Sequence, residues 1–175
     1  MSEPTRSEYA KTTPEHERDL TDESADPWAR HSAIGAVTFD RRYEFEPVLR
    51  EYVDHPDPIV RAAATRRLLA MWEREDLVDR AIEMALSDPD EYVRGEVVTG
   101  LGYVGTYGGV KPGTIDRVAR ALIRVMMTEE DWVEQVSAYN SLYSLLMGRR
   151  APMRPDEPFD RDRDVDWEML GPYLD

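Results

Sequence analysis

The sequence contains no cysteine among its 175 residues. This absence excludes disulfides, thiolate catalysis and cysteine-bound zinc, and it fits a reducing compartment. No stretch approaches the run of about 18 apolar residues that a membrane-spanning helix needs. The first residues also lack the apolar centre of a signal peptide. We therefore expect a cytoplasmic protein that does not bind membranes.

Lysine is nearly absent as well, since Lys11 and Lys111 stand against twenty arginines. The formal net charge is −14, whereas phosphate binding needs clustered basic side chains. We therefore expect no nucleic-acid partner, and the charge favours a protein partner with a basic surface. The first 25 residues carry −4 and the last 25 carry −5, so a strongly acidic folded face that mimics DNA is not expected.

Catalytic patterns are missing too. His16, His31 and His55 lie too far apart for a local metal motif. No grouping of serine, histidine and acid is recognisable from its spacing. Residues 105–114 are rich in glycine, but they do not end in the Gly-Lys-Ser or Gly-Lys-Thr of a phosphate-binding loop. We expect no enzymatic activity and no cofactor.

One acidic run resembles a metal-binding loop, with aspartate at positions 160, 162, 164 and 166. A calcium loop of this type needs glycine at its sharp turn and a bidentate glutamate at its end. Val165 and Gly171 occupy those two positions. We therefore expect no metal site in this run.

What the sequence does contain is a repeated pattern. Its clearest copy is Asp57-Pro-Ile-Val-Arg-Ala-Ala-Ala-Thr-Arg-Arg-Leu-Leu69, and weaker copies begin at Asp26 and Asp90. The arginine four residues after each aspartate recurs at spacings of 31 and 33 residues. Aspartate caps the free N–H groups of a helix start, and proline suits the first helical position. A period of this length therefore predicts an architecture of helical repeats.

The chain divides around these repeats. Residues 1–25 are acidic and have few periodic apolar residues, so we expect a disordered tail. Residues 26–148 form the predicted repeat domain, in which the first repeat is visible only as its second helix. Residues 149–175 begin as a linker rich in proline and aspartate and end in apolar residues. We expect that end to fold back and cap an exposed repeat, as solenoid ends require.

Two alternatives remain inside the repeat domain. The last long helix begins at Asp131, but its register against the third repeat is 40 or 41 residues, depending on whether Val133 or Leu142 is matched. The third repeat carries glycines at 95, 100 and 102, which weaken a helix by about 0.8 to 1 kcal/mol each. Close packing or a binding surface would explain them.

The unit Asp-Pro-x-Val-Arg-x-x-Ala-x-x-x-Leu that begins at Asp57 resembles a HEAT-type repeat, especially the short bacterial HEAT-like repeats. The resemblance implies an all-α fold: a right-handed α-solenoid of about three to four antiparallel helix pairs, whose second helices line a concave face. It also implies a ladder of aspartate and arginine between repeats. Arg30, Arg61 and Arg94 are therefore expected to be structural, and proteins of this type usually bind other proteins.

Candidate binding residues follow from placing each second helix on a wheel of 100° per residue. If Val60, Ala64 and Leu68 face the core, the opposite side of each helix faces the partner. We also include the loop at 105–113. The predicted partner-binding residues are His31, Arg66, Leu69, Thr99, Tyr107, Lys111, Gln135 and Tyr139.

Three functions compete at this stage. The first is a non-enzymatic protein-binding scaffold or adaptor that uses its concave face. The second is an antitoxin or immunity-type inhibitor that caps a basic enzyme surface, which the acidic balance and the small size favour. The third is a HEAT-like lyase, because some proteins with similar repeats attach bilins, but no residue identifies that chemistry.

Overall fold

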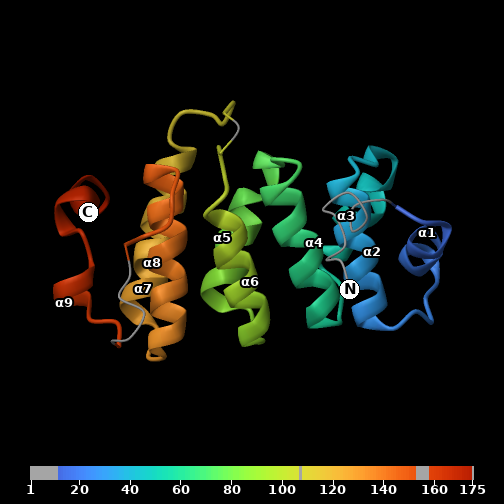
Figure 1. The fold of residues 1–175 in the computed structure, drawn as a ribbon, viewed down its shortest axis with the longest axis horizontal. Coiled ribbons are helices and arrows are strands. Elements are labelled where there is room, and N and C mark those ends of the chain that lie inside the picture. The colour runs from blue at the N-terminus through green and yellow to red at the C-terminus, as the bar shows by residue number, and fades with distance from the viewer. Residues whose placement is uncertain (1–11, 107, 153–157, 175) are drawn as a thin grey trace, which may run out of the picture.

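The computed structural model describes residues 12–106, 108–152 and 158–174. Within these ranges the chain is all-α, and its ten α-helices follow one another along an extended array (Figure 1). Three short 3-10 turns accompany them: η1 (Tyr43–Phe45), η2 (Glu75–Leu77) and η3 (Gly171–Tyr173). The α-helices are α1 (Pro14–Thr21), α2 (Pro27–Phe39), α3 (Glu46–Tyr52), α4 (Pro58–Ala70), α5 (Val78–Ser87), α6 (Glu91–Leu101), α7 (Thr114–Thr128), α8 (Trp132–Met147), α9 (Arg161–Asp164) and α10 (Trp167–Leu170).

The second helix of every repeat starts in the same way. The N-cap residues of α2, α4, α6 and α8 are aspartates, and each carboxylate accepts a hydrogen bond from the backbone N–H two residues later at 2.7 to 2.9 Å. Proline occupies the first turn of α2 and α4. These caps satisfy donors that a helix start otherwise leaves free. The predicted helix starts at Asp26, Asp57, Asp90 and Asp131 are confirmed.

The helices form two layers. In one layer α2 packs on α4, α4 on α6 and α6 on α8, whereas between successive first helices only α5 and α7 pack extensively in the described part of the chain. A stack whose members approach more closely in one layer curves toward that layer. The exposed side of α2, α4, α6 and α8 is therefore the concave side, and we call it the inner face. This paired arrangement confirms the predicted HEAT-like solenoid.

Gly100 in α6 and Gly102 at its C-cap permit this close approach. A Cβ at Gly100 would lie 3.1 Å from Cα of Arg66 in α4, and a Cβ at Gly102 would lie 2.8 Å from Cα of Ser141 in α8. Both neighbours are backbone atoms, which cannot move aside as a flexible side chain does. A Cβ at Gly95 would meet nothing within 4 Å. The close-packing explanation thus holds for Gly100 and Gly102, while Gly95 borders open space.

The N-terminal boundary of the repeats differs from the prediction. Residues 12–25 were expected to belong to a disordered tail, but Pro14–Thr21 forms α1, whose Leu20 is fully buried against the first repeat. Thr13 and His16 form a capping box at its start, and the Tyr52 hydroxyl donates to the Leu20 carbonyl. A single buried leucine and two capping residues are a weak periodic signal. The helix is therefore stabilised mainly by packing; residues 1–11 lie outside the described residues.

The N-cap of α8 determines the register of the fourth repeat against the third. Asp131 takes the place of Asp90, so the third and fourth repeats are 41 residues apart. The position of the repeat arginine then falls on Gln135. The extra residues lie in the connection between α6 and α7, where Gly105, Gly108, Gly109 and Gly113 all adopt positive φ. L-residues rarely adopt that backbone conformation.

The C-terminal segment lies against the last repeat. Leu170 is fully buried and Val165 nearly so, and η3 contacts α7. The backbone N–H of Asp166 donates to the Tyr139 hydroxyl at 3.0 Å, and the ring of Phe159 lies 5.8 Å from that of Tyr139. The segment thus covers apolar surface that no further repeat covers. Residues 153–157 of the predicted linker lie outside the described residues.

Candidate protein-docking face

The repeat arginines hold neighbouring repeats together. Arg61 in α4 reaches the turn before α6, where its guanidinium binds Asp88 with Nη2–Oδ1 at 2.7 Å and Nε–Oδ2 at 3.0 Å. The two equivalent arginines contact the same position of the next turn: Arg30 meets His55 at 3.3 Å, and Arg94 meets Glu129 at 3.6 Å. The expected pairing of these arginines with the repeat aspartates is wrong, because Asp57 and Asp90 cap their own helices. The contacted position stands two residues before each cap and holds His55, Asp88 or Glu129. The arginines are therefore structural, as predicted.

The same position also secures its own turn. Arg61 and Arg94 each donate to the carbonyl two residues before their helix cap, at His55 and Asp88. In the fourth repeat Gln135 donates in the same way to the carbonyl of Glu129, at 2.8 Å. Gln135 was predicted to bind a partner, but its side chain is occupied by this turn.

Two further predicted residues are buried and cannot contact a partner. Leu69 is fully buried and borders Val78 and Val104, because both flanks of α4 are covered by α2 and α6. Tyr139 is 1% exposed and holds the C-terminal segment. The error at Tyr139 came from matching Val133 to Val93, since a shift of one residue rotates the helix surface by 100°.

The loop at 105–113 lies beyond the ends of the helices, away from the centre of the inner face (Figure 1). Lys111 is exposed, and its backbone N–H donates to the Glu75 carboxylate at 2.8 Å. The hydroxyl of Thr114 binds the same carboxylate, which lowers the pKa of Glu75. Tyr107, the other predicted residue of this loop, lies outside the described residues. The described loop residues are thus tied to η2.

Three predicted residues do lie on the inner face. His31 is half-buried, and its ring lies 5.4 Å from that of Trp28. Burial, with the charges of Arg67 and Arg66 in addition, lowers the pKa of His31. Arg66 binds Glu96 across the junction of α4 and α6 at 2.6 Å, and Thr99 is half-buried beside the junction of α6 and α8.

An apolar row runs along the starts of the four second helices. It consists of the residues two positions after each capping aspartate, and it is called the apolar row below. Trp28 and Val133 at its ends are each 54% exposed. The rings of Trp28 and Tyr92 lie 6.1 Å apart although α4 separates their helices. The row is Trp28, Ile59, Tyr92 and Val133.

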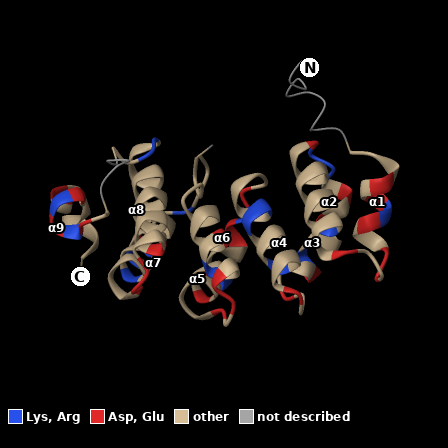
Figure 2. Cartoon of the chain, turned by 60° about the horizontal axis from the view of Figure 1, so that its bottom comes forward, with Lys and Arg blue, Asp and Glu red and all other residues tan. Residues whose placement is uncertain are grey.

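Acidic side chains border the apolar row. Exposed carboxylates lie in the turns before α2, α4 and α8 and at the first residue of α6, and Figure 2 shows acidic residues at these helix ends. We call this border the acidic edge. Its exposed members are Asp22, Glu23, Asp26, Asp54, Glu91, Glu130 and Asp131. An apolar strip beside clustered charge of one sign favours a partner with complementary charge.

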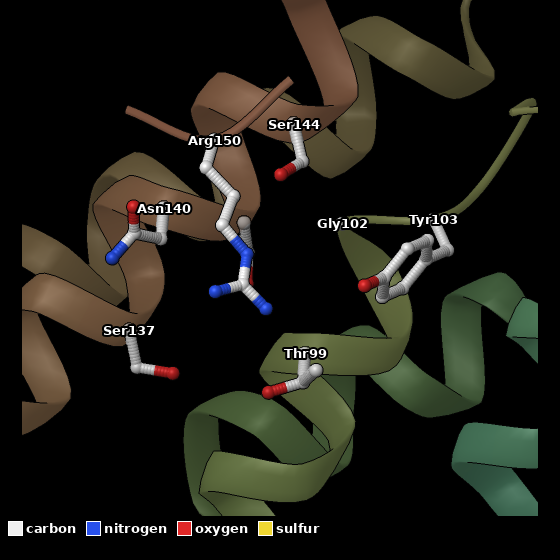
Figure 3. Close-up of a pocket in the computed structure, with 8 residues that line it drawn as sticks. Thr99, Gly102, Tyr103, Ser137, Asn140, Ser144 and Arg150 are labelled. Atoms are coloured by element: carbon white, nitrogen blue, oxygen red, sulfur yellow. The ribbon is translucent and has the colours of Figure 1, made fainter. Parts of the chain in front are cut away.

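A polar hollow of about 220 Å³ lies between α6 and α8 on the inner face. Figure 3 shows the Arg150 guanidinium at its centre, with the hydroxyls of Ser137, Thr99 and Tyr103 directed toward it. Its lining contains no aspartate or glutamate. The full lining is Thr99, Gly102, Tyr103, Ser137, Asn140, Ser141, Ser144 and Arg150.

Thr99 is the one residue of this hollow that was among the predicted partner-binding residues. With the register of 41 residues, Ser137, Asn140 and Ser144 stand six, nine and thirteen positions after the N-cap of α8. Thr99 in α6 and Tyr103 just after it occupy the last two of these positions, counted from the N-cap of α6. A register of 41 residues would therefore have placed these two serines and this asparagine on the predicted partner-binding side of α8. Nothing in the local sequence places Arg150 there.

A carboxylate pair lies at the same junction but nearer the turn. Glu129 and Glu134 face each other beside Arg94, whose Nε and Nη2 lie 3.6 Å from the nearest oxygen of each. A hydrogen bond with Glu129, together with burial and the charge of Glu129, raises the pKa of Glu134 to about 7. Two close carboxylates tend to share one proton, because they cannot both ionise without repulsion.

The described residues contain no group of three or more histidine, cysteine or acidic side chains arranged to hold a metal ion. The aspartates at 160, 164 and 166 instead serve the short helices: Asp160 and Asp166 cap α9 and α10, and Asp164 accepts from the Asp160 backbone N–H. Among the described helices, none is long and apolar enough to cross a bilayer.

Comparison with known protein families identifies the family to which these repeats belong. The HEAT repeats family matches residues 18–101, which run from within α1 to the end of α6. No curated protein and no solved structure matches the chain. HEAT repeats commonly serve as protein-interaction scaffolds. Residues 18–101 of this chain therefore belong to the HEAT repeat family.

Proposed function

We propose that this chain is a non-enzymatic protein-binding scaffold or adaptor that docks its partner on the inner face. One observation carries the proposal: the apolar row, Trp28, Ile59, Tyr92 and Val133, has a member in all four repeats. Its ends, Trp28 and Val133, are more than half exposed, and Ile59 and Tyr92 between them are partly buried. Exposed aromatic side chains in a concave surface are typical anchors of protein interfaces. The capping aspartates and the repeat arginines already bind groups within the repeats, whereas the side chains at the ends of this row are available to a partner.

The position of Trp28 makes it the best single test. Its ring contacts His31 and Tyr92, so it is held in place while more than half of its surface stays exposed. A side chain that is already ordered loses little entropy when a partner covers it. Loss of the indole should therefore weaken partner binding more than it weakens folding.

The experiment compares Trp28→Ala with Met127→Ala. Met127 is 47% exposed on α7, in the other layer of helices. Native lysate is passed over immobilised wild-type protein, and the captured protein is identified and purified. We expect Trp28→Ala to weaken its binding at least about tenfold, in the range of interface anchors, and Met127→Ala to leave it unchanged. Equal affinity of both variants and wild type would refute the inner face as the docking surface.

The acidic edge favours a second candidate, an inhibitor that caps a basic enzyme surface. Seven exposed carboxylates lie beside the apolar row, and such charge accelerates association with a basic partner in a salt-dependent way. The triple variant Glu23→Gln, Glu91→Gln, Glu130→Gln should slow association, whereas Asp116→Asn, Glu168→Gln should not. If the captured partner is an enzyme and this chain inhibits it, that inhibition would separate this role from scaffolding. An association rate that is independent of salt would exclude it.

A further inference from the structure

The polar hollow between α6 and α8 has a chemistry unlike the rest of the surface. The chain carries a net charge of −14, yet this hollow is lined by one arginine, hydroxyls and an amide, with no acid among them. The hollow is thus an isolated site of positive charge on the inner face.

The Arg150 side chain has no partner among the described residues. In the described segments 12–106, 108–152 and 158–174 it makes no hydrogen bond and no ion pair. The adjacent Arg149 is different, because its guanidinium binds the Tyr143 hydroxyl at 3.2 Å and lies over the Tyr143 ring. Arg149 thus has a structural contact, whereas the donors of Arg150 remain available.

The groups around Arg150 are also available. In the part of the chain that the structure describes, the side chains of Tyr103, Ser137, Asn140 and Ser144 have no hydrogen-bond partner. Thr99 differs, because its hydroxyl donates to the Gly95 carbonyl, which leaves only its oxygen to accept. A guanidinium with several O–H and N–H donors around one hollow suits an acceptor with several oxygens.

We propose that this hollow binds an oxyanion, a phosphate or carboxylate group, carried by the protein that docks on the inner face. Arg150 supplies the charge and two parallel N–H donors, and Ser137, Ser144 and Tyr103 supply hydroxyl donors on either side. The absence of acids in the lining removes the repulsion that the rest of the surface would impose. This assignment rests on the proposed function for the identity of the carrier, but the anion site itself is measurable without the partner.

The test uses the full-length protein and two small probes. Isotope-labelled protein is titrated with inorganic phosphate and, separately, with acetate at constant ionic strength, and amide chemical shifts are followed. We expect saturable shifts confined to the facing parts of α6 and α8 and to Arg150, with the stronger probe identifying phosphate or carboxylate as the preferred group. Arg150→Gln should weaken that binding at least about fivefold, because a charge-assisted pair is lost.

Arg149→Gln is the matched control, since it removes the same charge one residue away and outside the hollow. It should leave the affinity for the probe unchanged. Shifts that do not saturate, shifts spread over the whole surface, or equal affinity of Arg149→Gln and Arg150→Gln would overturn the proposal. A captured partner that depends on Trp28 but not on Arg150, with no saturable probe binding, would refute the oxyanion site while leaving the docking face intact. Saturable probe binding that depends on Arg150, together with partner binding that does not depend on Trp28, would refute the docking face while leaving the oxyanion site intact.

Discussion

Arg61 and Asp88 form a two-bond clamp between the second and third repeats, with Nη2–Oδ1 at 2.7 Å and Nε–Oδ2 at 3.0 Å. Their side chains are only 13% and 7% exposed. The Arg61 guanidinium holds the pKa of Asp88 below its usual range. A buried pair of this kind stabilises little relative to apolar packing, but removal of one partner leaves the other charge buried without compensation.

Asp88→Ala should therefore destabilise the protein by about 2 to 4 kcal/mol, measured by urea unfolding. The control is Asp54→Ala, which removes the partner of Arg80 in an exposed ion pair. The Asp54 side chain is 70% exposed and that of Arg80 is 41% exposed. We expect less than about 1 kcal/mol there. Because the folded pKa of Asp88 is depressed, its contribution is present at neutral pH and is lost as pH falls into the acid range. Equal losses in the two variants would contradict the clamp.

The Glu129–Glu134 pair should give the protein an opposite pH response. The pKa of Glu134 is raised to about 7 from an ordinary value of 4.5, so the folded state binds a proton more tightly than the unfolded chain. The stabilisation is full below pH 4.5 and is lost as pH rises through about 7. We expect unfolding free energy to fall by about 1 kcal/mol between pH 5 and pH 8, after allowance for the partial exposure of the pair.

Glu134→Gln should remove that part of the pH dependence, because glutamine keeps a neutral hydrogen-bonding group at the site. The neighbouring exposed Glu130→Gln serves as control and should keep the wild-type slope. Unfolding by denaturant at four or five pH values measures both. A wild-type curve that stays flat between pH 5 and pH 8 would show that the pair does not share a proton.

Gly95 in α6 and Gly102 at its C-cap should respond differently to substitution by alanine. Gly102→Ala places a Cβ 2.8 Å from Cα of Ser141, which forces α6 and α8 apart and should cost about 1 to 3 kcal/mol. Gly95→Ala meets open space within the same helix, so the better helix propensity of alanine should make it neutral or stabilising by up to about 1 kcal/mol. Thermal unfolding of both variants measures the difference. Similar losses would mean that helix propensity alone determines the effect.

Tyr139 should act on the C-terminal segment and not on a partner. Tyr139→Phe removes the acceptor for the Asp166 N–H and should cost about 1 kcal/mol. Tyr139→Ala also removes the packing against Phe159 and should speed hydrogen exchange in residues 158–174. Exchange in α4, which lies at the centre of the array, should be unchanged. Wild-type exchange in the C-terminal segment of Tyr139→Ala would refute the anchoring role.

The incorrect prediction at Leu69 shows what a helical wheel omits. A wheel gives each helix one buried and one exposed side, but α4 is covered by α2 on one flank and α6 on the other. The residue twelve positions after the cap is consequently buried in all four second helices, as Thr38, Leu69, Gly102 and Tyr143. Arg66, three residues before Leu69, remains half-buried because it faces the narrow strip between these contacts.

The sequence by itself determined the features that rest on local chemistry. The capping aspartates, the prolines after them and the recurring arginines specify where each second helix begins and how often the unit repeats, because a cap and its helix lie within a few residues. That repetition predicted stacked helical repeats, and the resemblance of the unit at Asp57 to HEAT-type repeats implied the HEAT-like fold. The helix α1 was missed because its stability depends on Leu20 packing against distant residues.

Only the tertiary structure decided which side chains remain exposed and which meet across repeats. The polar hollow joins Thr99 in α6 to Arg150 beyond α8, and the clamp joins Arg61 to Asp88. Neither contact has a signal within one helix. Both depend on the distance and rotation between stacked helices, which the packing of glycines and buried side chains sets for the assembly as a whole.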